Sequence, residues 1–204
     1  MHEFQETLID LMRHGEPVGG RRLRGSQDDP LSDDGWRQMR RAVGEHNPWK
    51  RIISSPLLRC AEFASELSNR HDIPIKQVAD FREIGFGDWE GMTPEEVMKA
   101  YPSFLQNYWK DPVTHTPPQA ETLDNFMQRV KQSWQTLLAE QAGQHTLLVC
   151  HGGTIRAILT EILAMPAQAL WRIEVPYANI SRIRVTRYPD GSMTQTLVFH
   201  KHEL

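Results

Sequence analysis

Two histidines of this 204-residue sequence follow directly after short apolar runs. His14 comes after residues 7–12, inside the segment Leu11-Met12-Arg13-His14-Gly15-Glu16, and His151 comes after residues 146–150. Apolar runs of this length favour buried strands. In an open α/β sheet, ligands bind beyond the carboxyl ends of the strands. We therefore expect both imidazoles to lie on one rim of a sheet.

Positively charged and hydrogen-bond-donating groups are expected at the same rim. Arg13 adjoins His14, and Arg59 falls in the first turn of the helix that follows the second predicted strand. Gly152 and Gly153 open a helix, where backbone N–H groups are free to bind an anion. Guanidinium groups bind phosphate oxygens through charge-assisted hydrogen bonds. The combination predicts a receptor for one dianionic phosphate group.

Each of these residues has a simpler explanation when it is taken singly. A single histidine at a strand end is usually a hydrogen-bonded surface residue, and a single arginine in a first helical turn is usually solvated. Only their combination in one place favours the phosphate site. A metal site is disfavoured, because the pairs His200/His202 and His145/His151 lack the carboxylate or cysteine partners of a zinc site. We therefore expect neither a metal ion nor another cofactor.

The elements that must position these residues alternate between strands and helices. Strands are predicted at residues 7–12, 51–54, 146–150, 181–187 and 194–199. Helices are predicted after Ser32, after Ser55, from Thr122 and after His151. In the second helix, Ser55 is the expected cap and Pro56 the expected first helical residue. This alternation predicts an α/β fold, a three-layer α/β/α sandwich with a mostly parallel central sheet.

We expect one domain over residues 1–204, in which residues 81–118 form a cap-like helical excursion over the active-site rim. This segment is rich in glycine, proline and aromatic residues, and its helices are expected to be short. Aromatic side chains between residues 86 and 109 could contact the organic part of a substrate. The arginines of Arg21-Arg22-Leu23-Arg24 could do so too, but a solvated basic loop is the simpler interpretation.

Composition excludes several classes of protein. The chain has 23 Lys+Arg and 26 Asp+Glu, a net charge of -3, which argues against a nucleic-acid binder that works by bulk charge. Cys60 and Cys150 form no spaced pair, so we expect small buried thiols rather than a disulfide framework, a zinc motif or nucleophiles. A reducing compartment fits this cysteine usage. The oligomeric state is not indicated.

A cytoplasmic protein that binds no membrane is expected. The sequence has no apolar run of 18 residues, and residues 1–6 are acidic, unlike a signal peptide. The final residues, Lys201-His202-Glu203-Leu204, resemble an endoplasmic-reticulum retention signal. That address needs a signal peptide to be used, so we interpret it as coincidence.

Five segments, in order along the chain, resemble the motifs of the histidine phosphatase superfamily, which includes the cofactor-dependent phosphoglycerate mutases. The segment around His14 is similar to the family signature, and the others follow it over nearly the whole chain. They are Asp29-Pro30-Leu31-Ser32, Ser54-Ser55-Pro56-Leu57 with Arg59, residues 82–91 from Arg82-Glu83 to Glu90-Gly91, and Val149-Cys150-His151-Gly152-Gly153.

The resemblance implies a role for each residue. His14 would be the nucleophile that forms a phosphohistidine, and Arg13, Arg59 and His151 would hold the phosphoryl oxygens. Glu83 would give a proton to the leaving alkoxide and then activate water. Physical chemistry agrees, because phosphoryl transfer needs mainly positioning and charge neutralisation, and a neutral imidazole is a competent nucleophile. Glu83 is preferred on its motif alone over the alternatives Glu16, Asp88 and Glu90.

The chain departs from the family pattern at three places. Pro17 stands where the family often has Glu-Thr after the glycine, and Gly20 stands where it often has an asparagine. Ala120-Glu121-Thr122 replaces the common Gly-Glu-Ser before the long helix. We expect these changes to affect the fit of the substrate more than the chemistry, with one polar contact to phosphate missing or supplied elsewhere.

The predicted function is a metal-independent phosphomonoesterase that acts on a small molecule. The run from Phe86 to Gly91 and the chain length most resemble the α-ribazole-5'-phosphate phosphatases of cobalamin synthesis. Sugar-phosphate or broad-specificity phosphatases are the alternative. A phosphoglycerate mutase is disfavoured because mutases of this family carry additional segments. A protein that binds phospho-ligands without turnover is the competing class.

Overall fold

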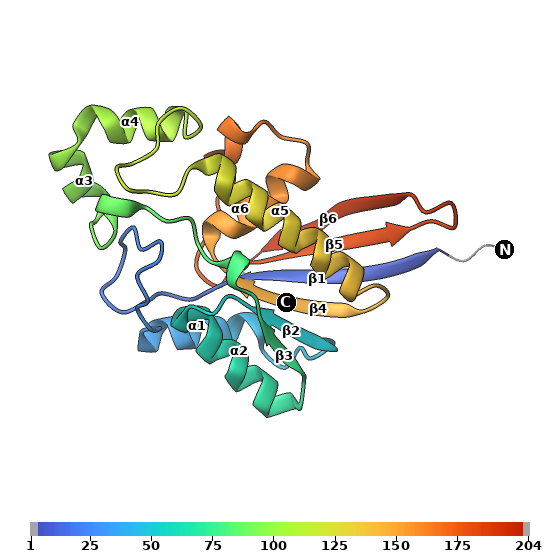
Figure 1. Ribbon diagram of the computed structural model, residues 1–204. Coiled ribbons are helices and arrows are strands. Elements are labelled where there is room, and N and C mark those ends of the chain that lie inside the picture. Colours follow the sequence, from blue (N-terminus) through green and yellow to red (C-terminus); the bar gives the residue numbers. More distant parts are fainter. Residues whose placement is uncertain (1–3, 202–204) are drawn as a thin grey trace.

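The structure is a computed structural model that describes residues 4–201 (Figure 1). Residues 1–3 and 202–204, which include part of the acidic N-terminus, His202 and most of the retention-like tail, lie outside the described residues. The described part contains six strands: β1 Gln5–Arg13, β2 Arg51–Ser54, β3 Ile75–Gln77, β4 His145–Cys150, β5 Ile180–Arg187 and β6 Met193–Lys201. Its six α-helices are α1 Asp33–Val43, α2 Leu58–His71, α3 Pro94–Ala100, α4 Pro102–Lys110, α5 Leu123–Glu140 and α6 Gly152–Ile162.

The strands form one mixed sheet in the order β3-β2-β4-β1-β5-β6. The pairs β3/β2, β2/β4 and β4/β1 are parallel, and β5 and β6 add an antiparallel hairpin beyond β1. The sheet is therefore mostly parallel, as predicted. Because β1, β2 and β4 run in the same direction, the residues that follow them meet at one rim.

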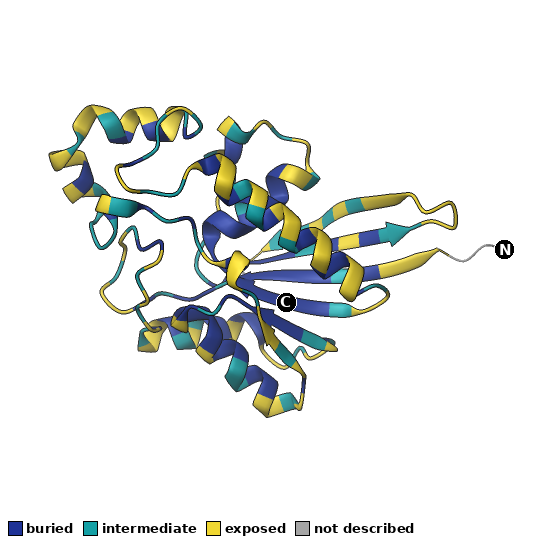
Figure 2. Ribbon diagram, in the orientation of Figure 1, coloured by how far each residue is buried: buried dark blue, intermediate teal, exposed yellow. Residues whose placement is uncertain are grey.

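Helices cover both faces of this sheet, which confirms the three-layer α/β/α arrangement (Figure 1). Alternate residues of β1 divide between the two faces, as the period of a strand requires. Ile9 and Leu11 pack in the core formed with α5 and α6, whereas Met12 packs in the core formed with α1 and α2. Figure 2 shows the central strands buried and the outer helix faces exposed.

The start of α2 differs from the prediction. Ser55 and Pro56 precede the helix, which begins at Leu58 after an N-cap residue without a side-chain bond. Ser55 instead prolongs the strand, because its backbone N–H donates to the Val149 carbonyl at 2.9 Å. The Asp28 carboxylate accepts from the Leu58 N–H at 2.6 Å. A distant side chain thus caps the first residue of the helix, while the Ser55 hydroxyl accepts from the Leu57 N–H at 3.3 Å.

Three helix starts agree with the sequence. The Ser32 hydroxyl accepts from the Gly35 N–H and caps α1, and the Thr122 hydroxyl accepts from the Asn125 N–H and caps α5. His151 is the N-cap residue of α6, so the glycines that follow it occupy the first turn. The segments that carry His14 and His151 therefore leave the sheet at the same end.

Residues 81–118 contain the short helices α3 and α4 and the 3-10 turn Gly87–Trp89. In Figure 1 this segment projects beyond the carboxyl ends of the parallel strands. Trp89 and Tyr108 are buried, with ring centroids 5.5 Å apart, and they form its interior. The segment therefore has an apolar interior that joins the core next to α5.

No helix within residues 4–201 is both long enough and apolar enough to cross a bilayer.

Candidate active site

The register of β1 and β4 brings the two predicted histidines together. Arg13 of β1 is paired with Cys150 of β4, so His14 and His151 are the next residues on adjacent strands. Their ring centroids are 5.2 Å apart at an interplanar angle of 64°. Parallel pairing has thus joined two residues that lie 137 positions apart in the sequence, as expected for this rim.

The side chains of Arg13 and Arg59 are held in place by backbone carbonyls. Arg59 donates from Nη1 to Gln27 O at 2.6 Å and from Nη2 to Gly25 O at 2.9 Å. Arg13 donates from Nη1 to Val175 O at 2.5 Å. In the described part of the chain, the Nε atoms of both arginines are buried and have no hydrogen-bond partner. Buried donors are usually paired, so both Nε groups are suited to bind an anion that enters the site.

Arg13 remains cationic despite its burial. Burial lowers the pKa of Arg13 to about 10, which still leaves its guanidinium charged at neutral pH. No carboxylate lies within 4 Å of the Arg13 or Arg59 side chain among residues 4–201. The two positive charges are therefore available to a ligand rather than neutralised by the protein.

The protonation state of His14 follows from one short contact. Nδ1 lies 2.7 Å from the carbonyl oxygen of Gly15, and a carbonyl can only accept, so Nδ1 carries the proton. Burial, reinforced by the charges of Arg59 and Arg13, holds the pKa of His14 well below its usual value. The imidazole is therefore neutral at pH 7, with the lone pair on Nε2 available for attack.

His151 lies behind the cavity rather than in its wall. It is fully buried, and its Nε2 is 2.7 Å from the Ser55 hydroxyl. Burial, with the positive charge of Arg59, holds the pKa of His151 well below its usual value. Gly152 is also absent from the cavity lining, whereas Gly153 is part of it. The structure thus brings His151 beside His14 but does not expose it to the space where a substrate would sit.

Glu83 lies at the start of α6, where the helix dipole favours an anion. Its Oε2 accepts from the Gly153 N–H at 3.0 Å. A Cβ on Gly153 would lie 2.2 Å from Glu83 Oε1, so glycine is required for the carboxylate to approach this closely. The Glu83 carbonyl accepts from Arg129 at 3.0 Å, and Arg129 in turn pairs with Glu121 at 2.7 Å. The altered Ala120-Glu121-Thr122 segment therefore supports the backbone at Glu83.

The alternatives to Glu83 lie elsewhere. Glu90 accepts hydrogen bonds from the Ser26 backbone and hydroxyl, and Asp88 is exposed. Neither of them, nor Glu16, lines the cavity that contains His14. Within the described residues, Glu83 is the only carboxylate in that lining. Geometry therefore supports the choice that the sequence could make only by motif.

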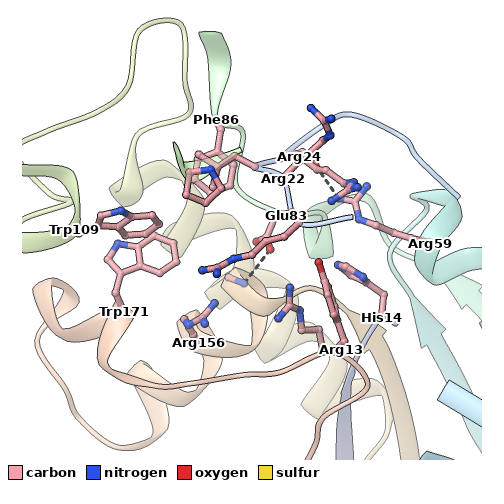
Figure 3. Close-up of a pocket in the computed structure, with 16 residues that line it drawn as sticks. Arg13, His14, Arg22, Arg24, Arg59, Glu83, Phe86, Trp109, Arg156 and Trp171 are labelled. Carbon is pink, nitrogen blue, oxygen red and sulfur yellow. Dashed lines mark hydrogen bonds between the residues drawn. The ribbon is translucent and has the colours of Figure 1, made fainter. Parts of the chain in front are cut away.

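The cavity beside His14 has a volume of about 510 Å³, within the usual range for small-molecule sites (Figure 3). Six arginines and one glutamate give its wall a strong positive charge. The lining residues are Arg13, His14, Arg21, Arg22, Leu23, Arg24, Gly25, Arg59, Glu83, Phe86, Pro94, Trp109, Gly153, Arg156, Trp171 and Tyr177. A local cationic site therefore exists in a chain whose net charge is -3.

Sequence reasoning missed Arg156, Trp171 and Tyr177. Arg156 could have been found, because it lies four residues after Gly152 on the same face of the predicted helix. Trp171 and Tyr177 lie in and after the 3-10 helix Ala167–Arg172, where no periodic pattern marks them. The Arg13 guanidinium carbon lies 4.2 Å from the Tyr177 ring centroid, so Tyr177 supports that arginine through a cation–π contact.

The arginines of residues 21–24 differ in exposure: Arg21 and Arg22 are exposed, as a solvated loop predicts, whereas Arg24 is not. Arg24 is buried, pairs with Asp29 at 2.8 Å and donates to Val18 O at 2.7 Å. Arg22 donates to the carbonyl of Gly91 at 2.5 Å. All three arginines line the cavity. The solvated-loop interpretation therefore fails at Arg24, which is held by Asp29 and Val18, and it holds for the exposed Arg21 and Arg22.

The two departures near the nucleophile have different structural contexts. Pro17 forms an isolated bridge with Leu31, which holds the segment after His14 beside the start of α1. Gly20 has a φ of +71°, and a Cβ at this position would contact nothing within 4 Å. Gly20 is not part of the cavity lining, so this position contributes no polar side chain there.

The cysteines agree with the sequence prediction. Cys60 and Cys150 are both buried free thiols, and burial raises the pKa of each. A buried thiol of raised pKa is a poor nucleophile. Between residues 4 and 201, no cluster of three or more His, Cys, Asp and Glu side chains is placed to hold a metal ion.

Comparison with known proteins identifies the family. Residues 9–194 match the model of the histidine phosphatase superfamily (branch 1), so the chain belongs to that superfamily. The solved structure of Bacillus stearothermophilus YhfR is similar with a TM-score of 0.85 and 27% identity, covering 97% of this chain and 98% of that one.

Several relatives are named as phosphatases, which supports a phosphoric monoester hydrolase. The uncharacterized phosphatase PhoE of Bacillus subtilis is 33% identical over 76% of this chain and 77% of its own length. The adenosylcobalamin/alpha-ribazole phosphatase of Salmonella typhimurium is 29% identical over 86% and 89%. Mycobacterial relatives at 29% identity are longer, and the chain spans only 53% of their length.

One relative weakens an argument made from chain length. The 2,3-bisphosphoglycerate-dependent phosphoglycerate mutase 2 of Gloeobacter violaceus is 26% identical over 94% of this chain and 91% of its own length. A protein named as a mutase is thus nearly as compact as this one. Length alone therefore does not separate the phosphatases from the mutases in this family.

Proposed function

We propose that this chain is a metal-independent phosphomonoesterase that acts through a phosphohistidine intermediate. One observation carries the proposal: the neutral His14, protonated on Nδ1, lies in a cavity with two buried guanidinium groups whose Nε donors are unpaired. Such donors, fixed by backbone carbonyls before the ligand arrives, suit the charge that develops on a transferring phosphoryl group.

The first half-reaction transfers the phosphoryl group to His14. Arg13 and Arg59 bind the phosphoryl oxygens, and His14 Nε2 forms a bond to phosphorus while the bond from phosphorus to the ester oxygen breaks. Glu83, as the carboxylic acid, gives its proton to that oxygen, which leaves as an alcohol. The Nδ1–H bond to Gly15 O lies at 2.7 Å and keeps the ring oriented as it becomes charged.

The second half-reaction releases phosphate. The Glu83 carboxylate takes a proton from water, the water oxygen bonds to phosphorus, and the bond to His14 Nε2 breaks. Glu83 ends protonated and the imidazole neutral, so the cycle closes. We assign His151 and the helix start at Gly152 as further phosphoryl contacts. His151 would exchange its bond to the Ser55 hydroxyl, 2.7 Å long here, for one to a phosphoryl oxygen.

Trapping by a rapid alkaline quench tests this chemistry. Wild-type protein mixed with a ³²P-labelled phosphomonoester should yield base-stable, acid-labile protein-bound phosphate, and His14→Ala should yield none. His71→Ala, which removes a histidine at the distant end of α2, is the matched control and should trap as much as wild type. Equal trapping by wild type and His14→Ala would refute the phosphohistidine.

A second assay separates an enzyme from a protein that only binds phospho-ligands. Hydrolysis of p-nitrophenyl phosphate in the presence of EDTA should proceed with wild type and be lost in His14→Ala. Absence of hydrolysis at every pH would favour the binding protein. Hydrolysis that stops on adding EDTA would contradict the metal-independent mechanism.

For the substrate we propose α-ribazole 5'-phosphate, hydrolysed to α-ribazole in cobalamin synthesis. The resemblance of residues 86–91 and the 29%-identical Salmonella relative support this choice. The aromatic part of the cavity wall also suits a ring-bearing alcohol. Sugar-phosphate or broad-specificity phosphatase activity is the alternative, with phosphoglycerate mutase less favoured. Comparing kcat/KM for α-ribazole 5'-phosphate, phosphoglycerate and sugar phosphates decides between them.

We further propose that residues 1–204 form one catalytic domain and that residues 81–118 serve as its cap. The family match over residues 9–194 and the contribution of Phe86 and Trp109 to the cavity support this division. We also propose a cytoplasmic location, which suits two buried free thiols. The partner is a small phosphorylated molecule rather than a nucleic acid or a membrane.

A further inference from the structure

The cavity beside His14 is larger and more varied than a phosphoryl group requires. Its catalytic end carries Arg13, His14 and Arg59, while its other end is walled by Phe86, Trp109 and other aromatic residues (Figure 3). The phosphate chemistry described above makes no use of this second end. This second end is therefore left for the alcohol part of the ester.

Two tryptophans form the main part of that wall. Trp109 comes from α4 and Trp171 from the 3-10 helix before β5, and their ring centroids are 4.8 Å apart at 86°. Edge-to-face packing of this kind is favourable for aromatic rings. Each indole thus fixes the other, and the pair joins the cap segment to the C-terminal third of the chain.

Trp171 is supported from two further sides. The Arg156 guanidinium carbon lies 5.4 Å from its ring centroid, and Tyr108 lies 5.7 Å away, centroid to centroid. Arg156 is itself fixed, because its Nε donates to Ile173 O at 2.7 Å. A ring held by three neighbours presents a rigid face, which lowers the entropic cost of binding against it.

The exposure of Trp109 distinguishes it from the core aromatics beside it. Tyr108, the preceding residue, is 2% exposed, and Trp89 is 0% exposed, whereas Trp109 is 37% exposed. The core of the cap is thus complete without the Trp109 face. Because Trp109 also lines the cavity, its exposed face is available to a ligand there.

We propose that Trp109 and Trp171, with Phe86, form a leaving-group subsite that selects phosphomonoesters whose alcohol carries a planar aromatic ring, as in a nucleotide. This subsite rests on the phosphomonoesterase proposed above and defines its substrate class. Every planar heterocycle has a face that can stack on an indole, so the subsite favours an aryl-bearing ester over one with only a sugar. Trp109 and Trp171 are specificity-determining residues.

A matched pair of substrates isolates the ring. α-Ribazole 5'-phosphate and ribose 5-phosphate share a ribose carrying a phosphate on its 5-hydroxyl, so their leaving alcohols are alike and only the first bears a benzimidazole. Wild type should show kcat/KM at least about tenfold higher for the ring-bearing ester, as stacking on one aromatic residue supports. Adenosine 5'-monophosphate serves as a third substrate that tests whether any planar base suffices.

Variants then assign the preference to the tryptophans. Trp109→Ala should lower kcat/KM for α-ribazole 5'-phosphate about tenfold, mostly through KM, and leave ribose 5-phosphate within about twofold. Trp109→Phe keeps an aromatic face and should recover most of the preference. Trp171→Ala should act as Trp109→Ala does, with melting temperature measured alongside. Tyr188→Ala, an exposed aromatic residue in the β5–β6 turn, is the control and should change nothing.

The outcomes separate this inference from the proposed function. Equal kcat/KM for the two esters in wild type, or an equal loss on both in Trp109→Ala, would overturn the subsite while phosphohistidine trapping still supports the phosphatase. Absence of both trapping and turnover would overturn the phosphatase and the subsite with it. A ring-dependent loss confined to the tryptophan variants supports the proposal.

Discussion

Two clusters of charged and histidine side chains lie on the same pair of strands, β1 and β4, and they differ in whether their hydrogen bonds are complete. Asp10 of β1 is fully buried and accepts from Trp49 Nε1 at 2.8 Å, from His145 Nε2 at 2.9 Å and from Arg182 at 2.7 and 2.9 Å. At the carboxyl end of β1, Arg13 and the neighbouring Arg59 of α2 keep unpaired buried donors, as far as residues 4–201 show.

Whether the hydrogen bonds of a buried polar cluster are complete distinguishes a structural cluster from a ligand-binding site. Burial by itself would raise the pKa of Asp10, but the hydrogen bonds from Arg182, His145 and Trp49 together lower it to about 2. That carboxylate is therefore fully satisfied and has no remaining capacity for a ligand. The cluster around His14 combines surplus positive charge, free donors and an open cavity, so a ligand completes it.

Among changes in the cluster around His14, Glu83→Gln should have the largest effect on kcat. The amide cannot donate a proton to the leaving oxygen, so kcat for an alkyl phosphate should fall about 10²- to 10⁴-fold. p-Nitrophenyl phosphate, whose leaving group needs no proton, should lose much less, and steady-state kinetics on both substrates measures the difference. Asp88→Asn is the control at an exposed rival. If Asp88→Asn lowered kcat more than Glu83→Gln, Asp88 would be the general acid instead.

Asp10→Asn should give the largest effect on stability. The substitution removes the negative charge that compensates Arg182, and breaking a buried pair costs about 3–5 kcal/mol of unfolding free energy. Urea denaturation measures this loss, and kcat of the folded protein should stay within about twofold of wild type. Asp34→Asn, at an exposed ion pair with Arg37, should cost under about 1 kcal/mol. If Asp10→Asn lowered kcat as much as Glu83→Gln does, the cluster around Asp10 could not be called purely structural.

Inorganic phosphate should stabilise the protein by binding to the cluster around His14, and not to the cluster around Asp10. A ligand at one hundred times its Kd stabilises by about 2.7 kcal/mol, which thermal unfolding with and without phosphate detects. Asp10→Asn should keep this increment although its baseline is lower, and Arg13→Met should lose most of it. If Arg13→Met kept the full increment, the unpaired Nε of Arg13 would not belong to an anion site.

The two clusters should also lose stability in different pH windows, which is the smallest effect. The folded-state pKa of His14 lies well below its unfolded value near 6.5, so below that pH the unfolded chain takes up a proton that the folded site refuses. Stability should therefore fall with acidification by up to about 1.4 kcal/mol per pH unit for this residue. His14→Asn should flatten the slope between pH 6.5 and 5, and His71→Asn should not.

Asp10 acts in a lower window. Its pKa falls from 3.8 in the unfolded chain to about 2 in the fold, so its stabilisation is present above pH 4 and is lost as pH falls toward 2. The loss amounts to about 2 kcal/mol. Denaturation midpoints between pH 4 and 2 for wild type and Asp10→Asn test it, and parallel curves for the two proteins would contradict it.

Local patterns predicted most of the elements because the physics behind them is local. Ser32 and Thr122 were identified as helix caps from their own side chains, and both accept the expected N–H bond. The prediction of Ser55 as the cap was wrong. The helix begins at Leu58, whose N–H donates to the Asp28 carboxylate, 30 residues earlier in the sequence. A cap supplied from a distant loop leaves no sign near the helix that it caps.

By itself the sequence determined the alternating α/β order and the pair of strand ends that carry His14 and His151, since apolar runs and strand direction follow from local pattern and chain order. Tertiary structure alone decided three things: that His151 lies behind the cavity, that Arg24 is buried, and that Trp109 meets Trp171. Each depends on contacts between segments far apart in the chain, whose distances are set by packing and not by spacing in the sequence.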